Sequence, residues 1–181
     1  MLETLPKRLS VWPAQNILTR CHTCATSPRR SATVSMRVNG AWLLCEDEIV
    51  RPVVPGMVRL AEGNWLEVPF LLDAGADRTV FSARFLRRLQ HLETEGAEAV
   101  TLSGVGGPAR SITVTTAIAF VRDDGRMVTV RGSFGVFVEA ESADLSVLGR
   151  DVTNNFSVIY DYPDQTVALL AAPHSYEIRK L

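Results

Sequence analysis

Two acidic residues, Asp73 and Asp77, follow an apolar run and frame a short turn of small residues, Ala74-Gly75-Ala76. An acid at the end of a buried strand is costly unless hydrogen-bond donors stabilise it. A turn of small residues can direct backbone N–H groups at a carboxylate and hold it in place. A carboxylate held in this way can act as a general base on a water molecule. By itself the turn also fits an ordinary strand end, because Asp and Gly are common turn residues.

Three further segments favour a chemical role for Asp73. The run Val-Pro-Phe-Leu-Leu at residues 68–72 predicts a buried strand that presents the acid. Residues 103–107, Ser-Gly-Val-Gly-Gly, lie between two strand-like runs, and their glycines give the freedom that a closing flap needs. Residues 146–151, Ser-Val-Leu-Gly-Arg-Asp, combine an apolar pair with a glycine and an Arg-Asp pair. The simpler interpretations are a flexible hairpin and a solvated arginine.

Together and in this order, the three segments resemble those of the retropepsin-like family, the single-lobed aspartic proteases of retroviral type. The resemblance covers residues 57–171. It implies an all-β fold, a closed β-barrel with one or two short helices, that is active as a homodimer. Peptide hydrolysis by this route needs two carboxylates that share one proton around a water molecule. The chain has one such loop and is too short for two lobes, so Asp73 of a second copy would supply the other carboxylate.

The resemblance also implies a role for the residues around Asp73. Ala74, Gly75 and Ala76 would shape the active-site loop, and Thr79, Gly149, Arg150 and Asp151 would support it, with Arg150 paired to Asp77. An extended peptide substrate would contact Asp77, Arg78 and the flap residues Ser103, Gly104, Val105, Gly106 and Gly107. Arg78 would line a pocket and favour an acidic substrate side chain. No metal or organic cofactor is implied.

Ala74 departs from the family pattern, which has Thr or Ser at the middle position of the Asp-x-Gly motif. In the family that hydroxyl makes hydrogen bonds across the dimer axis. Each lost hydrogen bond is worth on the order of 1 kcal/mol. Two functions therefore stay open: an aspartic endopeptidase of lowered activity, and a retropepsin-like dimer that binds extended peptides without cutting them.

Composition narrows the remaining possibilities. The chain of 181 residues fits one domain with an extension, and its net charge of −1 gives no electrostatic basis for binding nucleic acid. No apolar run is long enough for a membrane-spanning helix or a secretory signal, and three cysteines do not form a disulfide framework, so we expect a cytoplasmic protein. Cys21 and Cys24 are spaced like half of a zinc site, but only His22 and Cys45 are left to complete it.

Residues 1–35 carry many basic residues and a single acid, Glu3, with no regular period. They fit a disordered tail, an organelle transit peptide, or a segment upstream of a true start at Met36. The expected order is then an N-terminal β extension at 36–56, the protease-like domain at 57–172 and a C-terminal tail at 173–181.

Turn signals and alternation predict the elements of these parts. Asn39-Gly40 predicts a hairpin within 35–44. Further strands are expected at 53–60, 65–72, 99–102, 111–121, 127–139, 157–160 and 165–170, with short helices at 82–92, capped by Ser82, and 151–156.

Overall fold

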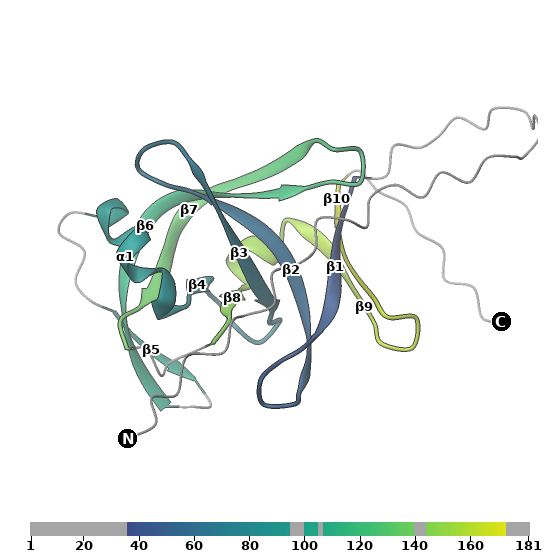
Figure 1. Ribbon diagram of the computed structural model, residues 1–181, viewed down its shortest axis with the longest axis horizontal. Coiled ribbons are helices and arrows are strands. Elements are labelled where there is room, and N and C mark those ends of the chain that lie inside the picture. Colours follow the sequence, from purple (N-terminus) through teal and green to yellow (C-terminus); the bar gives the residue numbers. More distant parts are fainter. Residues whose placement is uncertain (1–35, 95–99, 105–106, 140–143, 173–181) are drawn as a thin grey trace, which may run out of the picture. The chain divides into compact units, whose positions relative to one another are not determined.

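The computed structural model describes residues 36–94, 100–104, 107–139 and 144–172 (Figure 1). The extension at 1–35, the tail at 173–181, the flap residues Val105 and Gly106, and the Cys21–Cys24 pair therefore lie outside the described residues. The strands are β1 (Arg37–Leu44), β2 (Val50–Arg59), β3 (Trp65–Leu72), β4 (Val80–Phe81), β5 (Val100–Gly104), β6 (Gly107–Val121), β7 (Met127–Phe137), β8 (Ser146–Leu148), β9 (Phe156–Asp161) and β10 (Thr166–Ala171). Helical segments are short: α1 (Leu86–Leu89), flanked by the 3₁₀ turns Ala83–Phe85 and Gln90–Leu92, and α2 (Arg150–Thr153). The expected all-β class is confirmed.

Strand pairing closes part of the sheet into a ring. β2 pairs with β3, β3 runs parallel to β8, β8 pairs with β4, β4 runs parallel to β7, and β7 pairs with β6. The ring closes where β6 returns to β2, with Ala119 opposite Met57 and Ile118 opposite Val58. Closure pairs backbone groups that would otherwise form open edges. It also places β3 and β8, the strands that precede Asp73 and Gly149, next to each other.

Aromatic side chains pack together within a mainly aliphatic core. Phe70, Phe81 and Phe120 are fully buried, and the ring of Phe70 lies 5.7 Å from that of Phe81 and 6.3 Å from that of Phe120, centroid to centroid. Such tilted and edge-on aromatic pairs add packing energy beyond their buried area. Phe70 lies in β3, so this packing anchors the end of the strand from which Asp73 emerges.

The hairpin predicted at Asn39-Gly40 is wrong, because β1 runs straight through both residues. Its first half pairs with β10 and its second half with β2. A Cβ atom at Gly40 would lie 2.5 Å from the carbonyl oxygen of Val53. A glycine is therefore required by the close approach of another strand and not by a turn.

The strand β2 continues across residues 56 and 57, where the expected protease-like domain begins, and residues Val34–Leu181 form one compact unit. The cap expected at Ser82 differs in the structure. Ser82 occupies the N-cap of the first 3₁₀ turn, but its side chain makes no capping hydrogen bond there. Its backbone N–H instead donates to the Ser146 hydroxyl at 3.0 Å. In the described part of the chain, every helix is too short or too polar to cross a membrane.

Candidate active site

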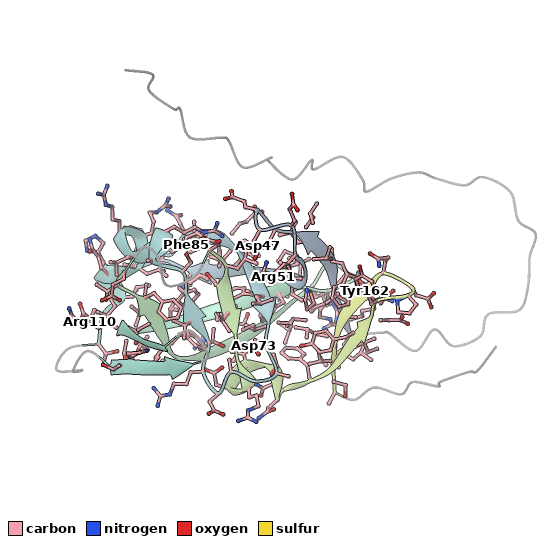
Figure 2. The ribbon with its side chains drawn as sticks, turned by 90° about the horizontal axis from the view of Figure 1, so that it is seen from below. Asp47, Arg51, Asp73, Phe85, Arg110 and Tyr162 are labelled. Carbon is pink, nitrogen blue, oxygen red and sulfur yellow. The ribbon has the colours of Figure 1, made fainter. Side chains whose placement is uncertain are left out.

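Asp73 lies at the end of β3, where the chain leaves the core and the side chain is partly exposed (Figure 2). The backbone N–H of Gly75 donates to Asp73 Oδ1 at 2.8 Å, and the N–H of Ala76 donates to the Asp73 carbonyl at 3.2 Å. The turn of small residues thus folds back on the acid. Backbone donors of this kind fix the direction of a carboxylate.

β8 holds this loop from the side. It runs parallel to β3 with Leu148 opposite Leu72, and the N–H of Asp73 donates to the Leu148 carbonyl at 3.3 Å. Because parallel strands end at the same edge, Gly149 emerges beside Asp73. A Cβ atom at Gly149 would lie 2.4 Å from the carbonyl carbon of Arg78. The two segments are therefore in backbone contact that only glycine permits.

Asp151 and Thr79 join the same two segments through a polar network. Thr79 is fully buried, and both its N–H and its hydroxyl donate to the Asp151 carboxylate, at 2.9 and 2.7 Å to Oδ1. The Thr79 hydroxyl in turn accepts a hydrogen bond from the N–H of Gly149 at 3.0 Å. Hydrogen bonds to an ionised carboxylate are stronger than neutral ones. This network fixes the C-terminal half of the loop.

The expected pair between Arg150 and Asp77 is present in the structure. Both side chains are largely exposed, and the pKa of Arg150 is raised because it donates to the Asp77 carboxylate. Exposed ion pairs contribute little to stability, so this pair orients Asp77 more than it strengthens the fold. A backbone hydrogen bond contributes more to holding the two segments together, because the N–H of Arg150 donates to the Ala76 carbonyl at 2.8 Å.

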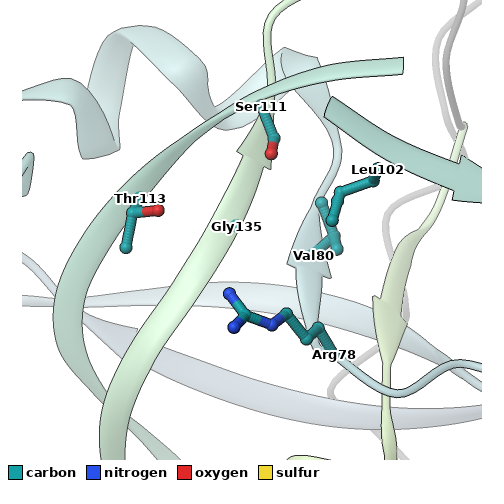
Figure 3. A pocket seen from close by; sticks show the side chains of 6 residues that line it. All are labelled: Arg78, Val80, Leu102, Ser111, Thr113 and Gly135. Carbon is teal, nitrogen blue, oxygen red and sulfur yellow. The ribbon is translucent and has the colours of Figure 1, made fainter. Parts of the chain in front are cut away.

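The sequence also predicted a glycine-rich hairpin, and β5 and β6 form it. Ser103 lies opposite Pro108, and Gly104 lies opposite Gly107, which has a positive φ of 97°. Leu102 of this hairpin and Arg78 of the Asp73 loop line one depression (Figure 3). The hairpin and the loop are thus brought to one place, while the contacts that a substrate would make with them stay a prediction.

Tyr160 is a residue near the site that the sequence did not indicate. It lies in β9, on the hairpin that ends the described chain, and its pKa is raised by partial burial and by the negative charge of Asp73. The segment Tyr-Asp-Tyr at 160–162 predicts only the end of a strand before a hairpin turn. No local signal connects it to the Asp73 loop, which is distant in the sequence.

Removing the charge of Asp73 is therefore expected to lower the pKa of Tyr160 toward its ordinary value. Tyrosinate forms more easily once the nearby carboxylate is gone, although the effect of burial stays. The measurement is a titration of tyrosinate absorbance in Asp73→Asn and in the unmodified protein, with Tyr160→Phe to assign the signal. An identical Tyr160 pKa in both proteins would show that the two groups do not interact.

No family model matches this chain, and no curated protein matches it. Among solved structures it is similar to a retropepsin-like aspartic protease from Rickettsia conorii, with 14% identity and a TM-score of 0.49 over 75% of this chain and 90% of that one. It is also similar to the retroviral protease-like domain of Ddi1 from Leishmania major, with 17% identity and a TM-score of 0.43 over 69% of this chain and 98% of that one.

Proposed function

We propose that this chain is one subunit of a homodimeric aspartic endopeptidase. The observation that carries the proposal is the Asp73 loop, in which a partly exposed carboxylate accepts a backbone hydrogen bond from Gly75 at the end of a buried strand. The pairing of β3 with β8 and the hydrogen bonds between Thr79 and Asp151 support the same loop. Such rigid support is what a catalytic carboxylate needs to keep its direction.

In the proposed reaction, Asp73 of each subunit contributes one carboxylate, and the pair shares a single proton because two like charges at close range do not both ionise. The ionised carboxylate takes a proton from water as the water attacks the scissile carbonyl. The protonated carboxyl donates a hydrogen bond to that carbonyl oxygen. A two-fold axis through the loops would bring the two acids together, since an isologous interface meets itself at the axis.

The β5–β6 hairpin supplies the second half of the proposal. We expect it to close over an extended peptide that adds itself as a strand, with alternate side chains directed into depressions of the surface. Gly104 and Gly107 give the tip its conformational freedom. Asp77, which Arg150 orients, would accept a hydrogen bond from the peptide backbone.

The test is cleavage of a mixed peptide library by the purified chain at several protein concentrations, from about pH 4 to 7, where shared carboxylate pairs are active. Specific activity is expected to rise with protein concentration, because only the dimer holds both acids. Size measurements on the same samples give the fraction of dimer. Activity that is independent of the dimer fraction would contradict the proposal.

Ala74 favours a second candidate function, a dimer that binds extended peptides without cutting them. No hydroxyl is available at this position to stiffen the paired loops. If the dimer forms but cleaves nothing, Ala74→Ser should restore cleavage or strengthen the dimer about fivefold, in line with one regained hydrogen bond. A dimer that binds peptides and stays inactive with Ser at this position supports the binding function.

A further inference from the structure

Exposed apolar side chains gather on two hairpins of the domain. In the described part of the chain, the large apolar side chains that are exposed are Leu44, Ile49, Trp65, Val121, Met127, Tyr160 and Tyr162. Two of them lie on the β1–β2 hairpin and two on the β9–β10 hairpin. Figure 1 shows the turns of both hairpins at the lower edge of the ribbon diagram, the edge toward which β3 runs to Asp73. Single apolar residues on a surface need no explanation, but a group of them at one edge marks an interaction site.

Residues 41–52, which we call the ribbon, extend beyond the strands that support them. β1 pairs with β10 only as far as Gly40. β3 pairs with β2 from Val53 onward, and the chain of β3 turns away at Asp73. Among the described residues, the two strands of the ribbon therefore pair only with each other, and each has an open edge. A two-stranded ribbon is marginally stable by itself, and its open edges can pair with another chain.

Hydrogen bonds hold the turn of the ribbon in one conformation. Arg51 donates to both carboxylate oxygens of Asp47, at 2.6 and 2.5 Å, and the N–H of Ile49 donates to the same carboxylate at 3.2 Å. The N–H of Cys45 donates to the Ile49 carbonyl at 3.0 Å. Since these bonds fix Ile49 in the free chain, less conformational entropy is lost when a partner covers its side chain.

Trp42 connects the ribbon to the β9–β10 hairpin. Its ring lies edge-on to that of Tyr162, 4.9 Å away between centroids, and its indole N–H donates to the Asp161 carbonyl at 3.2 Å. On the same hairpin, partial burial and the negative charge of Asp73 raise the pKa of Tyr160. The ribbon, the β9–β10 hairpin and the candidate catalytic acid therefore adjoin one another.

Resting on the proposed function, we propose that the ribbon binds a second copy of this chain, with Leu44 and Ile49 at the centre of the contact. The second Asp73 has to approach the edge at which the first one emerges, and the ribbon projects from that edge. Covering the ribbon removes apolar surface from water and supplies partners for its open strand edges, which stabilises the dimer. The ribbon lies outside residues 57–171, over which the sequence resembles the protease family, so this contact is a feature of this chain.

The experiment measures dimer dissociation by sedimentation velocity at a series of protein concentrations, with the full-length Asp73→Asn protein so that no chain is cleaved. Leu44→Glu and Ile49→Glu are each expected to raise the Kd of the dimer about a hundredfold or more. A charge at the centre of an interface must lose its water, and a symmetric dimer carries the substitution twice. The replaced side chains are 66% and 54% exposed, so the fold should be unaffected, and thermal unfolding verifies this.

Val121→Glu and Met127→Glu are the matched controls. These side chains are 50% and 49% exposed and lie opposite each other beside the β6–β7 turn, at the upper edge of Figure 1. Each control should change the Kd by about twofold at most, as substitutions on a free surface do. The inference is overturned if Leu44→Glu and Ile49→Glu leave the Kd unchanged, or if all four substitutions raise it equally.

Cleavage assays on chains that retain Asp73 separate this inference from the peptidase proposal. Leu44→Glu should lose cleavage at low protein concentration and regain the unmodified kcat/KM per dimer at high concentration. A dimer that needs the ribbon but cleaves nothing supports the inference and contradicts the peptidase, whereas a dimer that cleaves but tolerates the ribbon substitutions does the reverse. A chain that stays monomeric at every concentration, or whose ribbon binds an added extended peptide in place of a second copy, overturns the inference.

Discussion

Replacing Asp73 with Asn is expected to reduce peptide cleavage by about a thousandfold or more, as the loss of a general acid–base group does in other enzymes. Asn has the shape of Asp but neither holds the shared proton nor carries the charge that activates water. Its amide oxygen can still accept the hydrogen bond that Gly75 donates to Asp73 Oδ1, so the loop should keep its conformation. The measurement is kcat/KM at matched dimer fractions, with circular dichroism and thermal unfolding to verify the fold.

Asp164→Asn is the control for the loss of a carboxylate. Asp164 is an exposed acid in the β9–β10 turn, where it serves no role in the proposed reaction. Mixing adds a sharper test. If each active dimer needs both Asp73 residues, an equal mixture of unmodified and Asp73→Asn chains after subunit exchange should retain about one quarter of the activity and not about one half. Retention of one half would mean that each chain works alone, and the shared dyad would be wrong.

Gly149→Ala is expected to destabilise the fold by about 3 kcal/mol, at the upper end of overpacking costs. The new Cβ atom would lie 2.4 and 2.5 Å from the carbonyl carbon and oxygen of Arg78 and 2.8 Å from the nitrogen of Thr79. All three are backbone atoms, so no side-chain rotation relieves the contact. β8 must move away from the Asp73 loop, and the hydrogen bond from Gly149 to the Thr79 hydroxyl is lost with it.

Thermal unfolding measures this effect, and a fall in Tm of roughly 10 °C is expected for a domain of this size. Gly63→Ala is the matched control. Gly63 has a positive φ of 84° and open space around its Cβ position, so this variant reports backbone strain without a clash and should lose about 1 kcal/mol. A Gly149→Ala protein as stable as the Gly63→Ala protein would show that the contact with Arg78 is not tight.

The sequence predicted those elements whose signals are local. β2 and β3 contain apolar runs on either side of a Gly-containing turn, and β6 and β7 meet at an Asp-Asp-Gly turn in which Gly125 has a positive φ of 78°. The local sequence also identified Asp73 as an acidic residue that follows an apolar run. The pairing of β8 with β3 has no local signal in the sequence, because the composition of a three-residue strand does not identify its partner.

Long-range placement accounts for the features that sequence reasoning missed. Asn39-Gly40 carries the local signal of a turn, but the glycine is needed for the approach of β2 to β1. Tyr160 comes near Asp73 because the β9–β10 hairpin pairs with β1. The sequence alone does not reveal this pairing. Ser111 and Thr113 come to the depression lined by Arg78 only once β6, β7 and β4 are aligned.

The parallel pairing of β3 with β8 has a consequence for the order of folding. The β2–β3, β6–β7 and β9–β10 hairpins join neighbouring segments and have short loops to close. The Leu72–Leu148 pairing instead joins residues that are separated in the sequence by both the β5–β6 and the β6–β7 hairpins. Such non-local contacts form slowly, because the chain loses the entropy of loop closure before the contacts are made. Asp73 therefore acquires its final surroundings late, and a partly folded chain during synthesis lacks the contacts that hold its carboxylate in place.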